Sequence, residues 1–122
     1  EIAGMWEAHQ RFGKLKWSRL FQPAIELAKN GIPLNSYVHK HMRSQYELMD
    51  KELQSIFTNP VSGHMKEIGD LIKMPALAET LQIIANEGVD TFYRGSLRDD
   101  ILADLEEIGK VLLNSLKDSV LV

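Results

Sequence analysis

One run of the sequence, residues 74–96 (MPALAETLQIIANEGVDTFYRGS), contains in order the signals that start, fill and end a helix. Pro75 suits the first position of a helix, because its missing N–H would have had no partner there. Gly88 predicts the end of that helix, since glycine enters positive φ without strain. Between them, apolar residues recur at helical spacing, namely Leu77, Leu81 and Ile84 with Ala78 and Ala85 beside them. We therefore expect a helix over 75–87, one further helical turn over Val89–Tyr93, and a new helix from Ser96.

The first third of the chain has the same helical character. A helix is predicted from Ile2 to near Gly13, because one face collects the residues Ile2, Met5, Trp6 and His9. A second helix begins near Trp17 or Ser18 and ends at Gly31, with an apolar stripe of Phe21, Ile25 and Ala28. Pro23 lies inside it and predicts either a kink or two short helices that meet at Gln22.

The remaining segments complete the predicted architecture. Asn35 or Ser36 is a suitable cap for a third helix, whose buried face over four turns would be Val38, Met42, Met49 and Leu53. Residues 58–73 read as turns, with short extended pieces expected at 65–68 and 70–73. Ser96 caps the last helix with Asp99 three residues on, and its predicted core stripe is Leu97, Ile101, Leu105 and Ile108. The predicted fold class is thus all-α, with about five helices. Residues 1–122 are expected to form a single partial domain. The sequence patterns do not assign a structure to residues 110–122.

Composition limits the functional classes. The 122 residues carry 44% hydrophobic and 25% charged residues, which is typical of a folded soluble chain. A net charge of −3 provides no electrostatic footprint for nucleic acid, and no apolar run approaches the roughly 20 residues that span a bilayer. The absence of cysteine excludes disulfides, thiolate metal sites and a thiol nucleophile. Because the chain also begins without methionine, we interpret it as a fragment.

Few residues of the sequence suggest a catalytic or metal-binding role. His39 and His41 are two apart on a helix and point in different directions, so they do not form a metal pair. His9 lies on an apolar face, as expected of a hydrogen-bonded core histidine, and His64 is expected to be solvated. The carboxylate pairs Asp99/Asp100 and Glu106/Glu107 are adjacent rather than facing, which favours dipole pairing and a solvated helix face over acid–base catalysis.

Three further groups have a structural explanation as well as a functional one. Gly95 and Ser96 precede a helix and could hold an anion, but the phosphate-loop lysine and glycine run are missing, so a helix cap is favoured. The aromatic residues form no evident ligand site and are expected in the core; they are Trp6, Trp17, Phe21, Phe92 and Tyr93. Any of Arg19, Arg94 and Arg98 could bind a carboxylate, and the spacing selects none of them.

Four motifs together resemble the large subunit of gamma-glutamyltransferases (glutathione hydrolases). Residues 75–95 are similar to the family motif P-x-L-A-x-T-L-x-x-I-A-x-x-G-x-x-x-F-Y-x-G. Residues 13–33 are similar to a second family motif, G-x-L-x-W-x-x-L-F-x-P-A-I-x-L-A-x-x-G-[IF]-P. Residues 1–4 (EIAG), with Glu7-Ala8-His9 after them, and a loop with Phe57, Pro60 and Gly69-Asp70 also match. The resemblance covers Glu1 to Gly109. Beyond it, Lys110 and Leu113 depart from the glycine and threonine that are common in the family.

The resemblance implies an N-terminal-nucleophile hydrolase with an αββα sandwich, of which this chain would be part of the outer helical layer. The implied activity is cleavage of glutathione and transfer of the gamma-glutamyl group to water, amino acids or peptides. The nucleophile would be a threonine that begins the small subunit, and the arginine that grips the substrate would precede Glu1. Thr58, Thr80 and Thr91 are internal, so we assign no catalytic, cofactor-binding or metal residue here, and no cofactor.

The resemblance also implies partners and a location. The partners would be the small subunit and the rest of the large subunit, with glutathione as the substrate of the whole enzyme, and the location would be extracellular, cell-surface or periplasmic. The five apolar stripes are expected to exceed what they can bury against one another, so the chain alone should aggregate, dimerise or be marginally stable. The alternative is a non-catalytic helical binding module from a degenerated family member.

Overall fold

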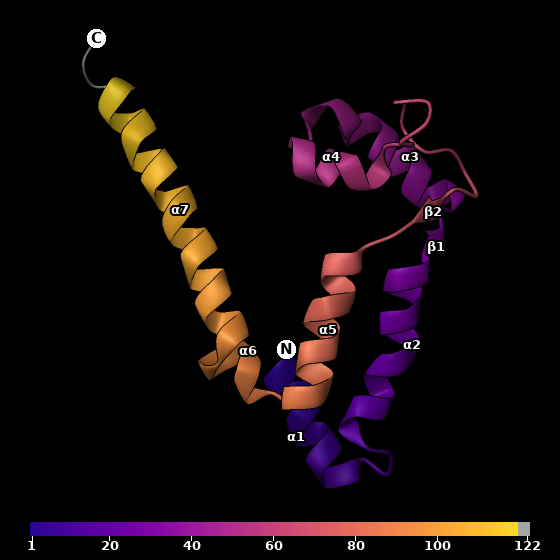
Figure 1. The fold of residues 1–122 in the computed structure, drawn as a ribbon, viewed down its shortest axis with the longest axis vertical. Coiled ribbons are helices and arrows are strands. Elements are labelled where there is room, and N and C mark those ends of the chain that lie inside the picture. Colours follow the sequence, from indigo (N-terminus) through magenta and orange to yellow (C-terminus); the bar gives the residue numbers. More distant parts are fainter. Residues whose placement is uncertain (120–122) are drawn as a thin grey trace. The chain divides into compact units, whose positions relative to one another are not determined.

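A computed structural model describes the backbone of residues 1–119 and the side chains of residues 1–110, and the chain is mainly helical (Figure 1). The chain divides into two compact units, one of residues 1–18 with the residues from Ile83 onward, the other Arg19–Gln82. Two helices, α2 (Trp17–Asn30) and α5 (Pro75–Glu87), contribute residues to both units. The predicted helical class is therefore confirmed.

The unit Arg19–Gln82 is organised around a short antiparallel ribbon. Strand β1 (Ile32–Pro33) pairs with β2 (Leu71–Ile72), and Ile32 lies opposite Ile72. Gly31, just before β1, has φ +109°, and a Cβ there would lie 2.9 Å from the Cβ of Leu71. Only glycine fits this turn without strain. The core of the unit consists of Ile25, Ala28, Leu34, Ile72 and Ala78.

The sequence reading of this region is partly confirmed. Strand β2 falls inside the extended piece predicted at 70–73, whereas the piece predicted at 65–68 is represented by a single bridge between Met65 and Thr58. Helix α2 is one helix that contains Pro23, so of the two predicted alternatives, a kink or two short helices, the second is wrong. Its Ile25 and Ala28 are buried, as the predicted stripe requires, and Phe21 is half-buried.

The third predicted helix is not continuous. The structure has α3 (Ser36–Gln45), a 3₁₀ turn η1 (Tyr46–Leu48) and α4 (Lys51–Phe57) in its place. Met49 is extended, and the side chain of Asp50 accepts a hydrogen bond from the N–H of Leu53 at 2.8 Å, which starts a new helix. The predicted Asn35 cap of α3 is confirmed, because its side chain accepts from the N–H of Val38 at 2.9 Å.

The other unit contains α1 (Ile2–Phe12), the end of α5, α6 (Asp90–Arg94) and α7 (Ser96–Ser119). Gly88 ends α5 with φ +84°, and α6 is the predicted extra turn. The N–H of Ala3, in the first turn of α1, donates to the hydroxyl of Tyr93 at 3.3 Å. Ile84, Ala85 and Leu97 are buried here. Local signals thus placed these helices correctly.

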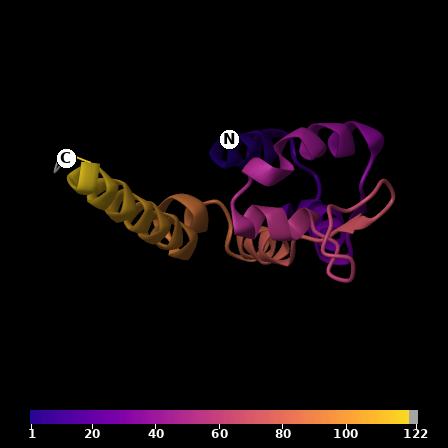
Figure 2. The same cartoon turned by 90° about the horizontal axis from the view of Figure 1, so that it is seen from above.

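Helix α7 differs from its prediction. It packs on α6 at its N-terminal end and then extends beyond it as one uninterrupted helix (Figure 2). Of the predicted core stripe only Leu97 is buried, whereas Ile101, Leu105 and Ile108 are 41%, 59% and 57% exposed. The prediction that these three residues are core was therefore wrong, since the described part of the chain leaves them exposed. Of the two residues that depart from the family pattern, Lys110 is exposed on α7, whereas the side chain of Leu113 lies outside the described residues.

Two further features concern the start of α7 and the length of the described helices. Helix α7 begins at Ser96 itself, and the Ser96 hydroxyl lies 3.3 Å from that of Thr91. Within the described part of the chain, no helix combines the length and apolar character that a membrane crossing needs.

Candidate functional site

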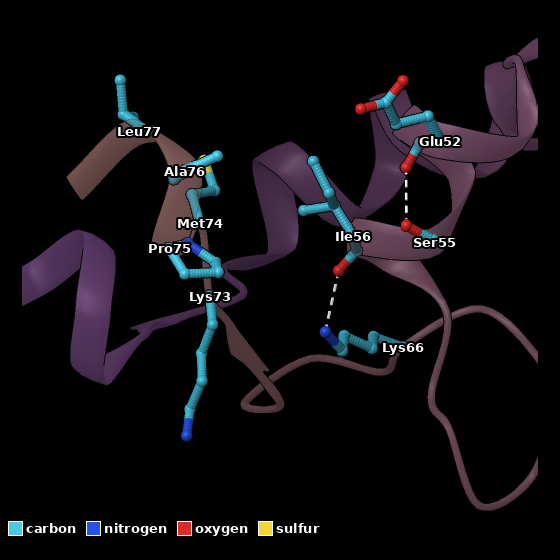
Figure 3. A pocket seen from close by; sticks show the side chains of 9 residues that line it. All are labelled: Glu52, Ser55, Ile56, Lys66, Lys73, Met74, Pro75, Ala76 and Leu77. Atoms are coloured by element: carbon cyan, nitrogen blue, oxygen red, sulfur yellow. Dashed lines mark hydrogen bonds between the residues drawn. The ribbon is translucent and has the colours of Figure 1, made fainter. Parts of the chain in front are cut away.

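The largest cavity described lies in the unit Arg19–Gln82, beside the start of α5 (Figure 3). It has a volume of about 420 Å³. Its lining residues come from α4, the 58–73 loop and the first turn of α5, and they are Glu52, Ser55, Ile56, Lys66, Lys73, Met74, Pro75, Ala76 and Leu77. Five of them are apolar, so the walls favour an apolar occupant.

Two of the polar side chains that line this cavity, those of Lys66 and Ser55, form hydrogen bonds within the protein. Lys66 reaches across to α4, where its ammonium donates to the carbonyl of Ile56 at 2.7 Å (Figure 3). A cation at the C-terminal end of a helix is favoured by the helix dipole. The hydroxyl of Ser55 donates to the carbonyl of Glu52 at 2.6 Å, so it is not paired with a base that would activate it. This geometry is suited to packing rather than to catalysis.

The aromatic residues at the start of the chain form a compact cluster around His9. The Trp6 and Trp17 rings meet edge to face at 5.0 Å between centroids, and His9 lies 6.0 Å from Trp6 and 5.4 Å from Trp17. His9 Nε2 donates to the carbonyl of Leu15 at 2.7 Å, because a carbonyl only accepts. His9 Nδ1 is buried, with no partner among the described residues. The predicted hydrogen bond of His9 is confirmed, whereas the residue is half-buried rather than part of the core.

One hydrogen bond, which the sequence analysis did not predict, connects this cluster to α5. The indole N–H of Trp17 donates to the carbonyl of Ile84 at 3.1 Å, although 67 residues separate them. No local pattern predicts such a pair. Phe92 and Tyr93, which the sequence analysis grouped with these rings, meet edge to face at 5.0 Å between centroids.

Of the other histidines, His39 and His41 have different partners. His39 Nε2 lies 3.4 Å from a carboxylate oxygen of Glu67, whereas the ring of His41 packs against Tyr37 at 4.5 Å between centroids. His64 is exposed in the loop. Among the described residues, no three His, Asp or Glu side chains converge as metal ligands would.

Each threonine hydroxyl is bonded inside the protein. Thr58 and Thr80 donate to helix carbonyls four residues earlier, those of Gln54 at 2.8 Å and Ala76 at 3.1 Å. Buried Thr91 donates to the Glu87 carboxylate at 3.0 Å, a contact across the α5–α6 turn that sequence reasoning missed. The i, i+4 spacing of a carboxylate and a hydroxyl was its only local signal.

The acidic pairs and arginines lie on exposed helix surfaces. Asp99 pairs with Arg98 at 2.7 Å and Glu106 with Lys110 at 3.2 Å, so neither acidic pair converges on one point. Arg19 and Arg94 are exposed. This arrangement is that of solvated helix faces.

One ionisable group has a shifted pKa. The hydrogen bond from the Ala3 N–H lowers the pKa of the Tyr93 hydroxyl below its usual value. This interaction stabilises the phenolate. Since Tyr93 is 40% exposed, this is a surface effect at the junction of α1 and α6.

Comparison with known proteins places these features in a family. The family model described as gamma-glutamyltranspeptidase matches residues 1–118. The chain belongs to this family. The predicted resemblance to gamma-glutamyltransferases is thus confirmed, and the family match extends past Gly109, where the sequence motifs ended.

Individual relatives agree with the family assignment. The chain is 41% identical over 114 residues to Scoloptoxin SSD14 of Scolopendra dehaani, covering 92% of this chain and 20% of that protein. It is 32% identical over 114 residues to glutathione hydrolase 3 of Arabidopsis thaliana, covering 92% of this chain and 18% of that protein. It therefore spans about a fifth of the length of these curated relatives.

A solved structure supports the fold. A gamma-glutamyltranspeptidase from Pseudomonas nitroreducens, complexed with L-DON, matches with a TM-score of 0.73 and 37% sequence identity. The match covers 88% of this chain and 31% of that chain. The family fold is that of an N-terminal-nucleophile hydrolase, as the sequence resemblance implied.

Proposed function

We propose that this chain is a helical segment of a gamma-glutamyltransferase that cleaves glutathione and transfers the gamma-glutamyl group to water, amino acids or peptides. The observation that carries the proposal is the family match over residues 1–118. The name of the Arabidopsis relative, glutathione hydrolase, supports the substrate. The remaining four-fifths of such an enzyme would be encoded outside these residues.

Within that enzyme, the role we propose for the chain is a scaffold that lacks the catalytic groups. An N-terminal threonine nucleophile uses its own amino group as the base. Thr58, Thr80 and Thr91 are internal, and their hydroxyls are bonded within the protein. This supports a nucleophile that lies elsewhere in the polypeptide.

The scaffold would bind the rest of the enzyme through apolar faces that the described residues leave exposed. On α7 these are Ile101, Leu102, Leu105 and Ile108, each at least 41% exposed. A contiguous apolar face of this kind typically marks an interaction surface. By the family resemblance, its partner would be a sheet layer of the αββα sandwich, together with the small subunit.

An activity assay tests the proposal directly. The 122-residue chain and the polypeptide extended by its flanking coding sequence would be compared on a gamma-glutamyl anilide substrate. We expect turnover by the extended protein and none above background by the chain alone. Turnover by the chain alone would refute the scaffold role, and an extended protein that matures into two subunits yet remains inactive would refute the enzymatic function.

A second candidate function is a non-catalytic binding module. The specific observation in its favour is that the relative with 41% identity is named a toxin, Scoloptoxin SSD14, whereas the Arabidopsis glutathione hydrolase is 32% identical. Pull-down with an intact small subunit separates the two candidates. The scaffold role predicts association with that subunit, and the binding-module role predicts none.

A further inference from the structure

We draw no further inference here: the strongest candidate, the cavity of about 210 Å³ where His39 and Arg43 of α3 meet His64 and Glu67 of the 58–73 loop, holds no convergent set of three metal-ligating side chains among the described residues, and nothing in the structure shows what would occupy it.

Discussion

Helices α5 and α7 have similar apolar periodicity but different surroundings. In α5, Ala78, Ile84 and Ala85 are at most 5% exposed, and the Trp17 indole donates to a carbonyl of this helix. In α7, Ile101, Leu105 and Ile108 are at least 41% exposed. Periodicity therefore identifies which face of a helix is apolar, whereas the rest of the polypeptide decides whether that face is buried. The exposed stripe of α7 is the surface to which we assign a partner in the proposed function.

The largest expected difference between the two helices is in the cost of truncating an apolar side chain. Ile84→Ala should lower the free energy of unfolding by about 2–5 kcal/mol, because it leaves a cavity in a packed site. Ile108→Ala should change it by less than about 0.5 kcal/mol, as at other exposed positions. Urea unfolding of the chain, followed by circular dichroism at 222 nm, measures both. Equal losses for the two variants would show that the α7 stripe is already packed in this chain.

The glycines of the two helices should respond to substitution in opposite directions. Gly88 ends α5 at φ +84°, so Gly88→Ala should destabilise the chain by about 1–2 kcal/mol. Gly109 lies inside α7, and a Cβ there would meet nothing within 4 Å, so Gly109→Ala should stabilise the helix by up to about 1 kcal/mol. Thermal unfolding of both variants provides the comparison. A loss of helix on Gly109→Ala would contradict a continuous α7.

The bond that joins Trp17 to α5 should contribute a smaller amount. Trp17→Phe removes the indole N–H and should cost about 0.5–1.5 kcal/mol from the lost hydrogen bond. Trp6→Phe is the matched control, because it removes an indole and leaves the bond to the Ile84 carbonyl intact. Unfolding should be followed by circular dichroism, since the chain has only two tryptophans. If Trp6→Phe costs as much as Trp17→Phe, ring packing accounts for the effect rather than the hydrogen bond.

The smallest effect concerns the exposed surface of α7. Lys110→Ala removes the i, i+4 ion pair with Glu106, whose side chains are 67% and 71% exposed. Such a pair is worth about 0.3–0.5 kcal/mol and is weakened by salt. Helicity measured at 222 nm in low and high salt should therefore differ less in the variant than in the unchanged chain. A salt-independent loss would indicate a role in packing instead.

The sequence predicted what depends on neighbouring residues. Pro75 and Gly88 bound α5 correctly, and Asn35 caps α3, because these signals act through backbone groups within four residues. The sequence analysis missed the break before α4, although Asp50 followed by Glu52 is a signal for the start of a helix. The apolar spacing that includes Met42 and Met49 favoured one continuous helix instead.

Contacts between distant segments could not be predicted in the same way. The Ile32–Ile72 pairing and the Trp17–Ile84 hydrogen bond join residues that no local pattern relates. The cavity at Lys66 and Met74 likewise forms only when α4, a loop and α5 come together. The exposure of the α7 stripe is a further case, since periodicity identifies an apolar face without showing whether another segment packs on it.

The central claim is that the α7 stripe is covered by the rest of a gamma-glutamyltransferase, and one pair of variants tests it most directly. Ile108→Asp and the control Val61→Asp, whose position is 95% exposed on a loop, would be placed in the protein expressed with its flanking coding sequence. We expect Ile108→Asp to lower the yield of assembled, active enzyme at least about tenfold, because it buries an unpaired charge, and Val61→Asp to leave that yield unchanged. Full assembly and activity of the Ile108→Asp protein would contradict the claim.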